Sequence, residues 1–421
     1  MKVLFLNPSG HLGGAERVLL DLMASIRTAR PDWLLQLIVG ERGALLESAQ
    51  ALGVATDVIA FPPSLATLGD AGAGGPAGAQ VGWLTMGAKF GAAAYSLHSY
   101  VKKLRHAIIT ATPDVIHSNG FKMHLLAVRA TPRSTPVLWH LHDYVGMRPV
   151  MSRLMKLYAR QCAVIVANSI SVAHDACVTL RGRTPVFTLR NAIDLTRFRP
   201  IGPRLDLDAL AGMEPAAKGV VRVGLPATTA RWKGHEVFLR AMAAIPAECP
   251  LRGYVIGGSL YRTTGSQYQL DELREMARRL GLEHRVAFTG FVDDMASAMR
   301  VLDIVVHAST QPEPFGLVIA EAMACACAVI TSATGGAAET IEPGANALTH
   351  PAGDVAALAA LITRLVKNPT ERSRLGAAAL RTATAAFDRA RMAGEIAPIY
   401  RRICAGGNGV AEAGVVRHAE G

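Results

Sequence analysis

The stretch LDIVVHASTQPEPFGLVIAEAMACACAVITSATGG, residues 302–336, contains the pattern that indicates the fold. A β-branched run, IVVHAS, is followed by a polar turn, an apolar helix-like run and a second β-branched run, AVITSA. This order is typical of a βαβ unit in a parallel sheet. Two carboxylates, Glu313 and Glu321, lie eight positions apart inside this otherwise apolar stretch. Their presence so close to a buried sheet needs a chemical reason.

The same alternation of strand-like and helical runs extends along the whole chain. At 421 residues the chain is long enough for two domains. We therefore predict two Rossmann-like, doubly wound α/β domains that face each other across a cleft. In such sheets ligands sit beyond the carboxyl ends of the strands, so functional residues are expected directly after strands. The strand candidates are KVLFLN, LQLIVG, DVIHSN, PVLWHLH, AVIVANS and VFTLRN in the first half, and VVRVGLP, GYVIGG, RVAFTG, IVVHAS and AVITSA in the second.

The domain boundaries follow from changes in composition. We predict a first domain over residues 1–195 and a second over residues 219–383, joined by a linker, 196–218, that is rich in proline, glycine and charge. The run FDRARMAGEIAPIYRRI predicts one last helix within residues 384–404. We expect the Gly/Ala/Pro-rich residues 61–81 to form an irregular loop and the tail, residues 405–421, to be disordered.

The bulk composition is that of a globular protein, since 50% of the residues are hydrophobic and 18% are charged. No apolar run reaches the roughly 18 residues that cross a bilayer. The apolar N-terminal run is too short for a signal peptide, and no small-residue cleavage site follows it. We therefore expect a cytoplasmic location. The six cysteines form no CxxC pair and are expected to be reduced core thiols, with Cys325 and Cys327 packed in an alanine-rich helix.

The net charge of +11 is uneven, because residues 148–204 carry ten Lys or Arg against only Asp175 and Asp194. On charge alone a basic surface suits nucleic acid, anionic lipid or a phosphorylated substrate. No zinc-finger, helix-turn-helix or RNA-recognition motif is present, so no nucleic-acid partner is expected. The triplet DLD, Asp206 to Asp208, matches a DxD metal motif but lies in the predicted linker and follows no strand. We therefore expect no metal ion.

Polar or glycine residues follow three of the predicted strands. Gly13 and Gly14 open a helix whose free N–H groups can bind an anion, although a tight turn explains the glycines equally well. His142 ends the strand WHLHDY, where an imidazole can donate to a sugar hydroxyl or a phosphate; a core histidine bonded to backbone is the alternative. Arg231 and Lys233 can neutralise a pyrophosphate, or else form a solvated basic turn.

The two glutamates fit the two ends of one ligand. Pro314 keeps Glu313 out of helical geometry, so a helix is predicted to begin near Phe315 or Gly316, with N–H groups available to phosphates. Glu321 then lies in the second turn, roughly 7 Å along the axis. Its carboxylate can accept two hydroxyl protons, which suits a ribose diol, and Glu313 can reach a second hydroxylated ring beyond the phosphates. One nucleotide sugar would span both acids.

Together these motifs resemble glycosyltransferase family 4, whose members have the GT-B fold. The resemblance covers most of the chain: the glycine pair, the His-Asp after a later strand, the basic pair before KG, the FTGF run, and E-x7-E followed by GG. It implies a retaining enzyme that moves a sugar from a UDP-, GDP- or ADP-linked donor to a hydroxyl, with neither a metal nor another cofactor. It also implies that the final helix crosses back to the first domain.

The resemblance assigns the catalytic roles to His142 and Glu313. Glu313 would contact the donor sugar and His142 would contact the same sugar near its reacting carbon. Glu321 would bind the ribose. The backbone of residues 315–317 would hold the sugar and the diphosphate, through Phe315, Gly316 and Leu317.

The remaining donor contacts are also implied by the resemblance. Arg231 and Lys233 would bind the diphosphate, and the Gly13–Gly14 pair would meet a phosphate through Gly14. The FTGFV run, residues 288–292, would line the nucleobase pocket through its backbone, with Gly290 and Phe291 at its centre. Members of the family often have the diphosphate-binding arginine five residues before the lysine. This chain has Thr228 at that position, so Arg231 is the candidate for the role.

These roles lead to a mechanistic hypothesis. The nucleoside diphosphate leaves, and the cations and the helix end near Gly316 stabilise the anion as charge develops. No residue is an obvious nucleophile, so we expect Glu313 to orient the donor and the acceptor to attack from the leaving-group face.

The acceptor is indicated by a basic amphipathic stretch, MSRLMKLYARQ, residues 151–161. Arg153, Lys156 and Arg160 lie on one helical stripe, and a second stripe is formed by Met151, Leu154, Met155 and Tyr158. Such a helix can lie on anionic membrane, with YVKKLRHAI, residues 100–108, adding charge. The alternative is an ordinary surface helix whose apolar side packs on the core. Membrane binding would imply a peripheral protein on the inner face of the cell membrane. The acceptor would then be a lipid-linked sugar or a lipopolysaccharide core. Without membrane binding, the expected acceptor is a glycan.

Two other functions stay open. A nucleotide-sugar 2-epimerase of similar architecture would release an epimerised donor without any acceptor. A non-catalytic sugar-binding protein of two domains is usually exported, and no signal peptide is evident here. A dehydrogenase is disfavoured because no GxGxxG follows the first strand with an acid about 20 residues further on.

Overall fold

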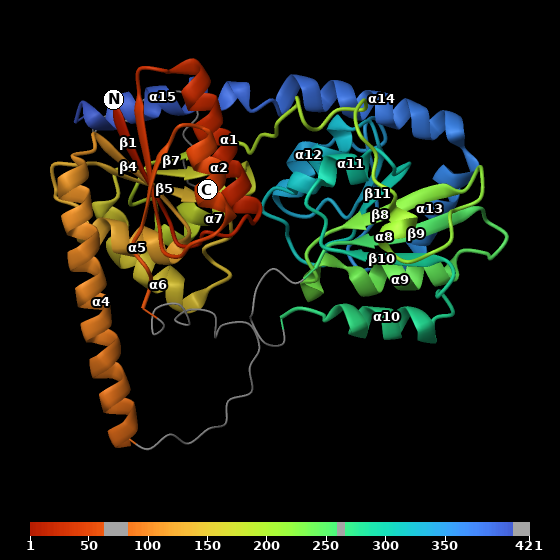
Figure 1. The fold of residues 1–421 in the computed structure, drawn as a ribbon, viewed down its shortest axis with the longest axis horizontal. Coiled ribbons are helices and arrows are strands. Elements are labelled where there is room, and N and C mark those ends of the chain that lie inside the picture. Colours follow the sequence, from red (N-terminus) through yellow and green to blue (C-terminus); the bar gives the residue numbers. More distant parts are fainter. Residues whose placement is uncertain (63–82, 259–265, 407–421) are drawn as a thin grey trace. The chain divides into compact units, whose positions relative to one another are not determined.

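The computed structural model describes residues 1–62, 83–258 and 266–406 (Figure 1). The chain divides into two compact units, Met1–Asn191 with Arg389–Gly421, and Ala192–Asp388. Most of the predicted loop 61–81 and of the predicted tail 405–421 lies outside the described residues.

The first unit contains a parallel sheet covered by helices. Its strands are β1 (Lys2–Asn7), β2 (Leu34–Val39), β3 (Ala55–Val58), β4 (Val115–Asn119), β5 (Val137–Leu141), β6 (Val164–Ala167) and β7 (Val186–Thr188). They are ordered β3-β2-β1-β4-β5-β6-β7, and each described pair is parallel. The helices are α1 (Gly14–Ala29), α2 (Ala44–Ala51), α4 (Trp83–Ala111), α5 (Phe121–Ala130), α6 (Pro149–Tyr158), the 3-10 turn η2 (Ala159–Gln161), α7 (Ile170–Leu180) and α15 (Ala390–Cys404).

The second unit repeats this plan. Its strands are β8 (Val221–Pro226), β9 (Leu251–Ile256), β10 (Val286–Gly290), β11 (Ile304–His307), β12 (Ala328–Thr331) and β13 (Leu348–Thr349), ordered β10-β9-β8-β11-β12-β13 in a parallel sheet. The helices are α8 (Leu207–Leu210), η3 (Arg231–Lys233), α9 (His235–Ala244), α10 (Leu270–Arg279), α11 (Met295–Met299), α12 (Leu317–Ala324), η4 (Gly336–Thr340), α13 (Val355–Lys367) and α14 (Pro369–Ala386). Two separate apolar cores, one containing Phe238 and the other Phe315, cover the sheet.

The central strands of both parallel sheets are buried on both faces, because helices cover each sheet on either side. In β1, residues Val3, Leu4, Phe5 and Leu6 are all fully buried, as expected for a strand between two helical layers. The strand order reverses between β1 and β4 in the first unit and between β8 and β11 in the second. At such a switch point the loops after the two central strands diverge, which makes a ligand site there. The prediction of two Rossmann-like α/β domains is confirmed.

Two strands were absent from the sequence prediction. β3 has the sequence ATDV, in which exposed and half-buried residues alternate at the edge of its sheet. β13 has only two residues, Leu348 and Thr349. Neither segment has the continuous apolar run by which the buried strands were identified.

The predicted linker, residues 196–218, is not a free connection. It packs on the second unit, where Phe198 and Leu207 are buried in the core that contains Phe315. Asp206 accepts the Ala209 N–H at 3.0 Å and so caps α8. Asp208 is buried and accepts hydrogen bonds from Arg252 at 2.7 Å and Arg222 at 3.1 Å. The linker interpretation did not include this packing because it depends on tertiary contacts, such as that of Asp208 with Arg252 on β9, 44 residues away in the sequence. The two acids of DLD therefore have structural roles.

The cysteines differ from the prediction in two details. Helix α12 ends at Ala324, so Cys325 and Cys327 lie after it and not within it. Both are nevertheless buried free thiols, and burial raises the pKa of Cys325 to about 12. Cys404, at the end of α15, is exposed and is therefore not a core thiol.

The last helix, α15, belongs to the first unit and packs against α1, as Figure 1 shows with α15 in blue and α1 in red. The Ser25 hydroxyl on α1 accepts the Ala393 N–H at 3.0 Å and donates to the Ala390 carbonyl at 3.2 Å. Arg389 forms an ion pair of 3.0 Å with Asp21. Across the described helices, none combines the length and hydropathy of a membrane-spanning segment.

Candidate functional site

The second unit brings Lys233 and Glu313 together at the switch point of its sheet. Lys233 ends η3, in the loop after β8, and Glu313 lies in the loop after β11. The Lys233 Nζ atom is 2.6 Å from Glu313 Oε2. The same oxygen accepts the Ser309 hydroxyl at 3.0 Å and lies 3.2 Å from His307 Nε2. Three donors therefore converge on one carboxylate oxygen of a residue that is only 8% exposed.

These contacts determine the charge of Glu313. Burial alone would raise its pKa, because a charged carboxylate is poorly solvated inside a protein. The Lys233 ammonium and the His307 hydrogen bond outweigh this effect, and the pKa of Glu313 is held well below its ordinary value. Glu313 is therefore an anion fixed in position, which can orient a ligand hydroxyl but is a poor proton donor.

His307, Ser309 and Thr331 were missed by the sequence analysis. The Thr331 hydroxyl accepts the Ala333 N–H at 3.0 Å and lies 3.0 Å from His307 Nδ1. Its own proton can thus be donated to Nδ1, which places the imidazole proton on Nε2, facing Glu313. The only signal in the sequence was the pair of polar residues, His307 and Ser309, directly after a buried strand.

The backbone of Glu313 is held by the loop that follows β12. The Glu313 N–H donates to the Thr334 carbonyl at 3.1 Å, and the Glu313 carbonyl accepts the Ala337 N–H at 3.3 Å. Gly335 lies in this loop with a φ of +66°, which favours glycine. The positive φ of Gly335 therefore allows the loop after β12 to form hydrogen bonds with both backbone groups of Glu313.

Helix α12 begins next to this pair. Gly316 is its N-cap, with a φ of +83°, and a Cβ at this position would come within 2.9 Å of Ile319 Cδ1. Phe315 is buried edge-on against Phe387 and anchors the turn. The N–H groups of Leu317 and Val318, at the start of the helix, have no acceptor within it and are suited to an anion. The next N–H, that of Ile319, donates to the Gly316 carbonyl at 2.9 Å. Glu321 is half-buried in the second turn of α12.

The other predicted donor residues of this unit lie in separate surroundings. Arg231 shares η3 with Lys233, but its guanidinium is 3.5 Å from Glu272 and lies 4.2 Å above the Tyr268 ring. It also lines a cavity of about 270 Å³ next to Thr310. Gly290 ends β10 with a φ of +68°, and Phe291 beside it is 60% exposed.

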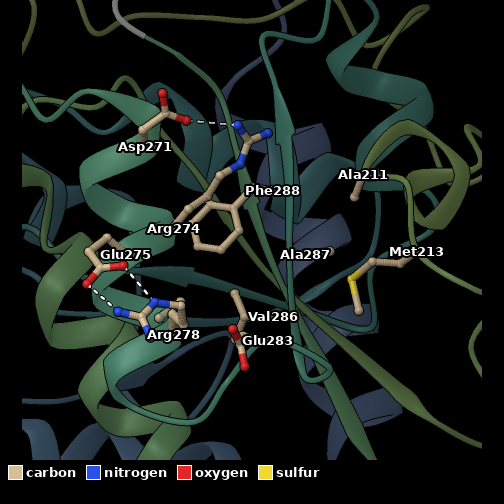
Figure 2. Close-up of a pocket in the computed structure, with 11 residues that line it drawn as sticks. Ala211, Met213, Asp271, Arg274, Glu275, Arg278, Glu283, Val286, Ala287 and Phe288 are labelled. Carbon is tan, nitrogen blue, oxygen red and sulfur yellow. Dashed lines mark hydrogen bonds and ion pairs between the residues drawn. The ribbon is translucent and has the colours of Figure 1, made fainter.

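A larger cavity, of about 380 Å³, lies along β10 (Figure 2). Four of its charged side chains form two ion pairs: Arg274 with Asp271 at 3.1 Å, and Arg278 with Glu275 at 2.7 Å. Neither Lys233 nor Glu313 lines it, so we place the site at the ion pair. The lining residues are Ala211, Met213, Asp271, Arg274, Glu275, Ala277, Arg278, Glu283, Val286, Ala287 and Phe288.

In the first unit, the glycine pair opens α1 as predicted, with Gly13 as the N-cap. A carboxylate already lies there: Glu16 Oε2 accepts the Gly13 N–H at 3.2 Å, and Glu16 Oε1 accepts from the Asn7 amide at 3.3 Å. Burial raises the pKa of Glu16. The sequence analysis did not consider Glu16, which uses one of the N–H groups that an anion would need. Gly14 remains exposed.

His142 lies directly after β5, and its carbonyl accepts from the Asn168 amide at 3.5 Å. Both of its ring nitrogens are shielded from solvent, and neither has a hydrogen-bond partner among the described residues. Burial lowers the pKa of His142 to about 3, so the imidazole is neutral at ordinary pH. The neighbouring Asp143 forms an ion pair with Arg148 at 2.9 Å. The alternative of a backbone-bonded core histidine receives no support from these contacts.

The predicted basic helix is α6, and its apolar residues separate into two groups. Met151, Met155 and Tyr158 pack on the core of the first unit, as the surface-helix alternative expects. Leu154 does not join them, since it is 41% exposed. It belongs instead to an exposed stripe that contains Val150, at 73%, and Leu157, at 66%.

Comparison with known proteins agrees with this architecture. Residues 223–382 match the group 1 glycosyl transferases and residues 44–197 match glycosyltransferase family 4. The chain is 30% identical to D-inositol 3-phosphate glycosyltransferase 1 of Catenulispora acidiphila, over 70% of this chain and 74% of that protein. It is 27% identical to the lipopolysaccharide core biosynthesis mannosyltransferase LpsB of Rhizobium meliloti, over 57% and 71% respectively.

A solved structure is similar over nearly the whole chain. The crystal structure of HepE from Anabaena in complex with UDP and glucose has a TM-score of 0.73 and 25% identity, and covers 95% of this chain and 99% of that one. The resemblance inferred from the E-x7-E segment is therefore confirmed at the level of the family. This chain belongs to glycosyltransferase family 4 and is a glycosyltransferase of the GT-B fold.

Proposed function

We propose that this glycosyltransferase transfers a sugar, with retention of configuration, from a nucleotide sugar to a hydroxyl of a glycan or lipid-linked acceptor. The observation that carries the proposal is the ion pair of Lys233 and Glu313 beside the amino end of α12. A cation and free N–H groups there suit a diphosphate, and a fixed carboxylate beside them suits sugar hydroxyls. The crystal structure of HepE contains UDP and glucose, which supports this class of donor.

Lys233 is the residue that we assign to the leaving group. In the reaction, the bond between the anomeric carbon and the diphosphate oxygen breaks, and a bond to the acceptor oxygen forms. The acceptor proton passes to the departing diphosphate. Lys233 and the N–H groups of α12 stabilise the negative charge on that diphosphate, which is where fixed dipoles and charges are most effective. Glu313 orients the transferred sugar, and we expect no metal ion to be needed.

The remaining predicted residues complete this proposal. We assign Glu321 to the ribose and the backbone of Gly290 and Phe291 to the nucleobase. Arg231 would have to leave Glu272 in order to reach the diphosphate. From the first unit, neutral His142 would donate to a hydroxyl of the transferred sugar.

Product analysis separates this function from epimerisation. The purified full chain is incubated with UDP-, GDP- or ADP-sugars, with and without membrane-extracted glycolipid acceptors. We expect sugar transfer to the acceptor with the anomeric configuration of the donor kept, and full activity in the presence of EDTA. Release of an epimerised donor in the absence of acceptor would instead favour the 2-epimerase, and inversion at the anomeric carbon would exclude the retaining mechanism.

We further propose that α6 places the first unit on anionic membrane, where a lipid-linked acceptor lies. Val150, Leu154 and Leu157 are spaced i, i+4 and i+7, so they form one stripe on the helix surface. Arg153 and Arg160 are exposed residues of the same segment. An exposed apolar stripe next to cationic residues is typical of a helix that lies in a membrane interface.

Vesicle flotation tests this surface. The full chain is expected to float with vesicles that contain phosphatidylglycerol and to stay in solution with purely phosphatidylcholine vesicles. The triple variant Val150→Ser, Leu154→Ser, Leu157→Ser should lose binding, while Ile201→Ser, at a residue that is 80% exposed in the other unit, should not. Equal binding to both kinds of vesicle, or no effect of the triple variant, would exclude the proposal.

A further inference from the structure

The Lys233 ammonium contacts an aromatic ring as well as Glu313. Its Nζ atom is 2.6 Å from Glu313 Oε2 and 4.1 Å from the centre of the Trp232 ring. A cation above an aromatic face is attracted by the electrons of the ring, and indole attracts it most strongly among the aromatic side chains. The Lys233 side chain is 19% exposed, so water screens this attraction only in part. Two contacts of different kinds therefore locate one ammonium group.

The backbone that carries the Trp232 ring is fixed to the loop after β11. Trp232 is the middle residue of η3, and its carbonyl accepts the Thr310 N–H at 2.7 Å and the Thr310 hydroxyl at 3.2 Å. Gly234 follows this turn with a φ of +79°, and it lies so close to the same loop that a Cβ would come within 1.9 Å of the Ala308 carbonyl oxygen. The Trp232 backbone is thus held by the loop that also carries Glu313, whereas the ammonium ends a flexible four-carbon stem.

The two contacts respond differently to an anionic ligand. A diphosphate competes with Glu313 for the ammonium, because both are anions that gain by pairing with it. The Trp232 ring has no net charge, so it does not have to be displaced when the anionic partner changes. Without the ring, the stem of Lys233 has more conformations available, and the ammonium has to be ordered at the moment of binding.

We propose that Trp232 is a positioning residue that keeps the Lys233 ammonium beside the start of α12 while its anionic partner changes from Glu313 to the diphosphate of the donor. This inference rests on the proposed function, which assigns Lys233 to the leaving group. Trp232 acts through Lys233 and need not touch the donor. Loss of its ring should therefore affect binding only when the ammonium is present.

Calorimetric titration of the full chain with UDP tests this dependence. Trp232→Leu keeps an apolar side chain without an aromatic face and should weaken UDP binding by about tenfold. Trp232→Phe keeps a face and should stay within about threefold of the wild type. In the Lys233→Ala background, Trp232→Leu should change the UDP affinity by less than about twofold, because the ring has no ammonium to hold.

Phe198→Leu is the matched control for the loss of a ring. The Phe198 ring lies 5.5 Å from the Arg197 guanidinium carbon in the same unit, so this variant also removes an aromatic face from a cation. It should bind UDP as the wild type does.

Proton–carbon NMR of the lysine-labelled full chain reports the ring contact directly. Protons above an aromatic face resonate at a lower chemical shift than ordinary lysine protons, and the Lys233 signal is identified by its absence from Lys233→Ala. We expect a low shift for the protons on Lys233 Cε in the wild type, both without a nucleotide and with UDP bound. In Trp232→Leu the signal should move to the ordinary range. The wild-type spectra decide the question if Trp232→Leu does not fold.

The outcomes are distinguishable. An ordinary shift for Lys233 in the wild type, or a return to the ordinary range when UDP binds, would overturn the inference. The same follows if Trp232→Leu leaves UDP binding unchanged, or weakens it equally with and without the Lys233 side chain. If the wild type binds none of UDP, GDP and ADP, the proposed function fails, and the spectrum of the ligand-free chain still decides whether Trp232 holds the ammonium.

Discussion

At the scale of single residues, Lys233 and Glu313 form an ion pair in which each neutralises the charge of the other. Their separation of 2.6 Å means that a bound diphosphate would compete with Glu313 for the ammonium group. His307 and Ser309 remain as donors to the carboxylate when that happens. If the proposed donor site is correct, we expect Glu313 to keep its charge and position during donor binding and Lys233 to be the side chain that moves.

Replacing Lys233 by Ala should remove one stabilising contact to the leaving group. Loss of such a contact typically costs about 3 kcal/mol, so kcat/KM should fall by about 10² to 10³. Steady-state kinetics with a saturating acceptor measures this effect. Lys218→Ala changes an exposed lysine of the same unit and should leave kcat/KM as it is. A loss of less than about threefold in Lys233→Ala would contradict the assignment.

Glu321 can be tested through the sugar that it is proposed to bind. A carboxylate that accepts ribose hydroxyls contributes about 1.5 to 3 kcal/mol per hydrogen bond. The wild type should therefore prefer a ribose donor to its 2′-deoxy analogue by about tenfold or more in kcat/KM. In Glu321→Ala this preference should disappear. A variant that keeps the full preference would show that Glu321 does not contact the 2′-hydroxyl.

At the scale of elements, Asp208 connects the segment 196–218 to the strands β8 and β9. Asp208 binds Arg222 and Arg252, and it accepts the Tyr254 hydroxyl at 2.7 Å. Burial alone would raise the pKa of Asp208, but hydrogen bonds from the Ala216 N–H and from these three side chains lower it to about 2. Asp206, two residues earlier, only caps the short helix α8.

The two aspartates of DLD should thus differ in their effect on stability. Asp208→Ala leaves the guanidinium groups of Arg222 and Arg252 without the carboxylate that they bind. It should lower the free energy of unfolding by about 3 kcal/mol. Asp206→Ala loses a helix cap and should cost about 1 kcal/mol. Urea unfolding of the full chain measures both. Equal losses in the two variants would show that Asp208 has no special role in docking this segment.

The accuracy of the sequence prediction also varied by element. Buried parallel strands such as β1 and β11 could be predicted because their apolar runs are continuous. The edge strand β3 could not, because half of its residues face solvent. Glu313 and Lys233 were proposed as site residues from the residue types that follow strands, and the structure brings these two side chains together. Thr331 could not be identified, because its contact with His307 exists only when β11 and β12 are neighbours in the sheet.

At the scale of the whole molecule, the buried histidines make stability depend on pH. His117 and His142 have their pKa lowered from 6.5 to about 3 by burial, because the charged form is disfavoured. In the unfolded chain these residues take up a proton near their ordinary pKa. The unfolded state therefore binds more protons below about pH 6.5. The full stability is present above that value and is lost as the pH falls towards 3.

Each such histidine should lower the free energy of unfolding by about 1.4 kcal/mol per pH unit below about pH 6. Urea unfolding between about pH 6.5 and about pH 5, where the ordinary histidine pKa lies, measures this slope. His117→Gln removes one of these groups and should show a shallower slope than the wild type. His284→Gln, at an exposed histidine of the second unit, should not change the slope. An identical slope in His117→Gln and the wild type would contradict the burial of a neutral His117.

The central claim is that a diphosphate binds where α12 begins, and the structure of the full chain crystallised with UDP tests it most directly. We expect the diphosphate at the N–H groups of Gly316 and Leu317, with Lys233 turned from Glu313 towards a phosphate oxygen and the ribose at Glu321. A nucleotide bound elsewhere, with Lys233 still paired to Glu313 and this end of α12 empty, would contradict the account.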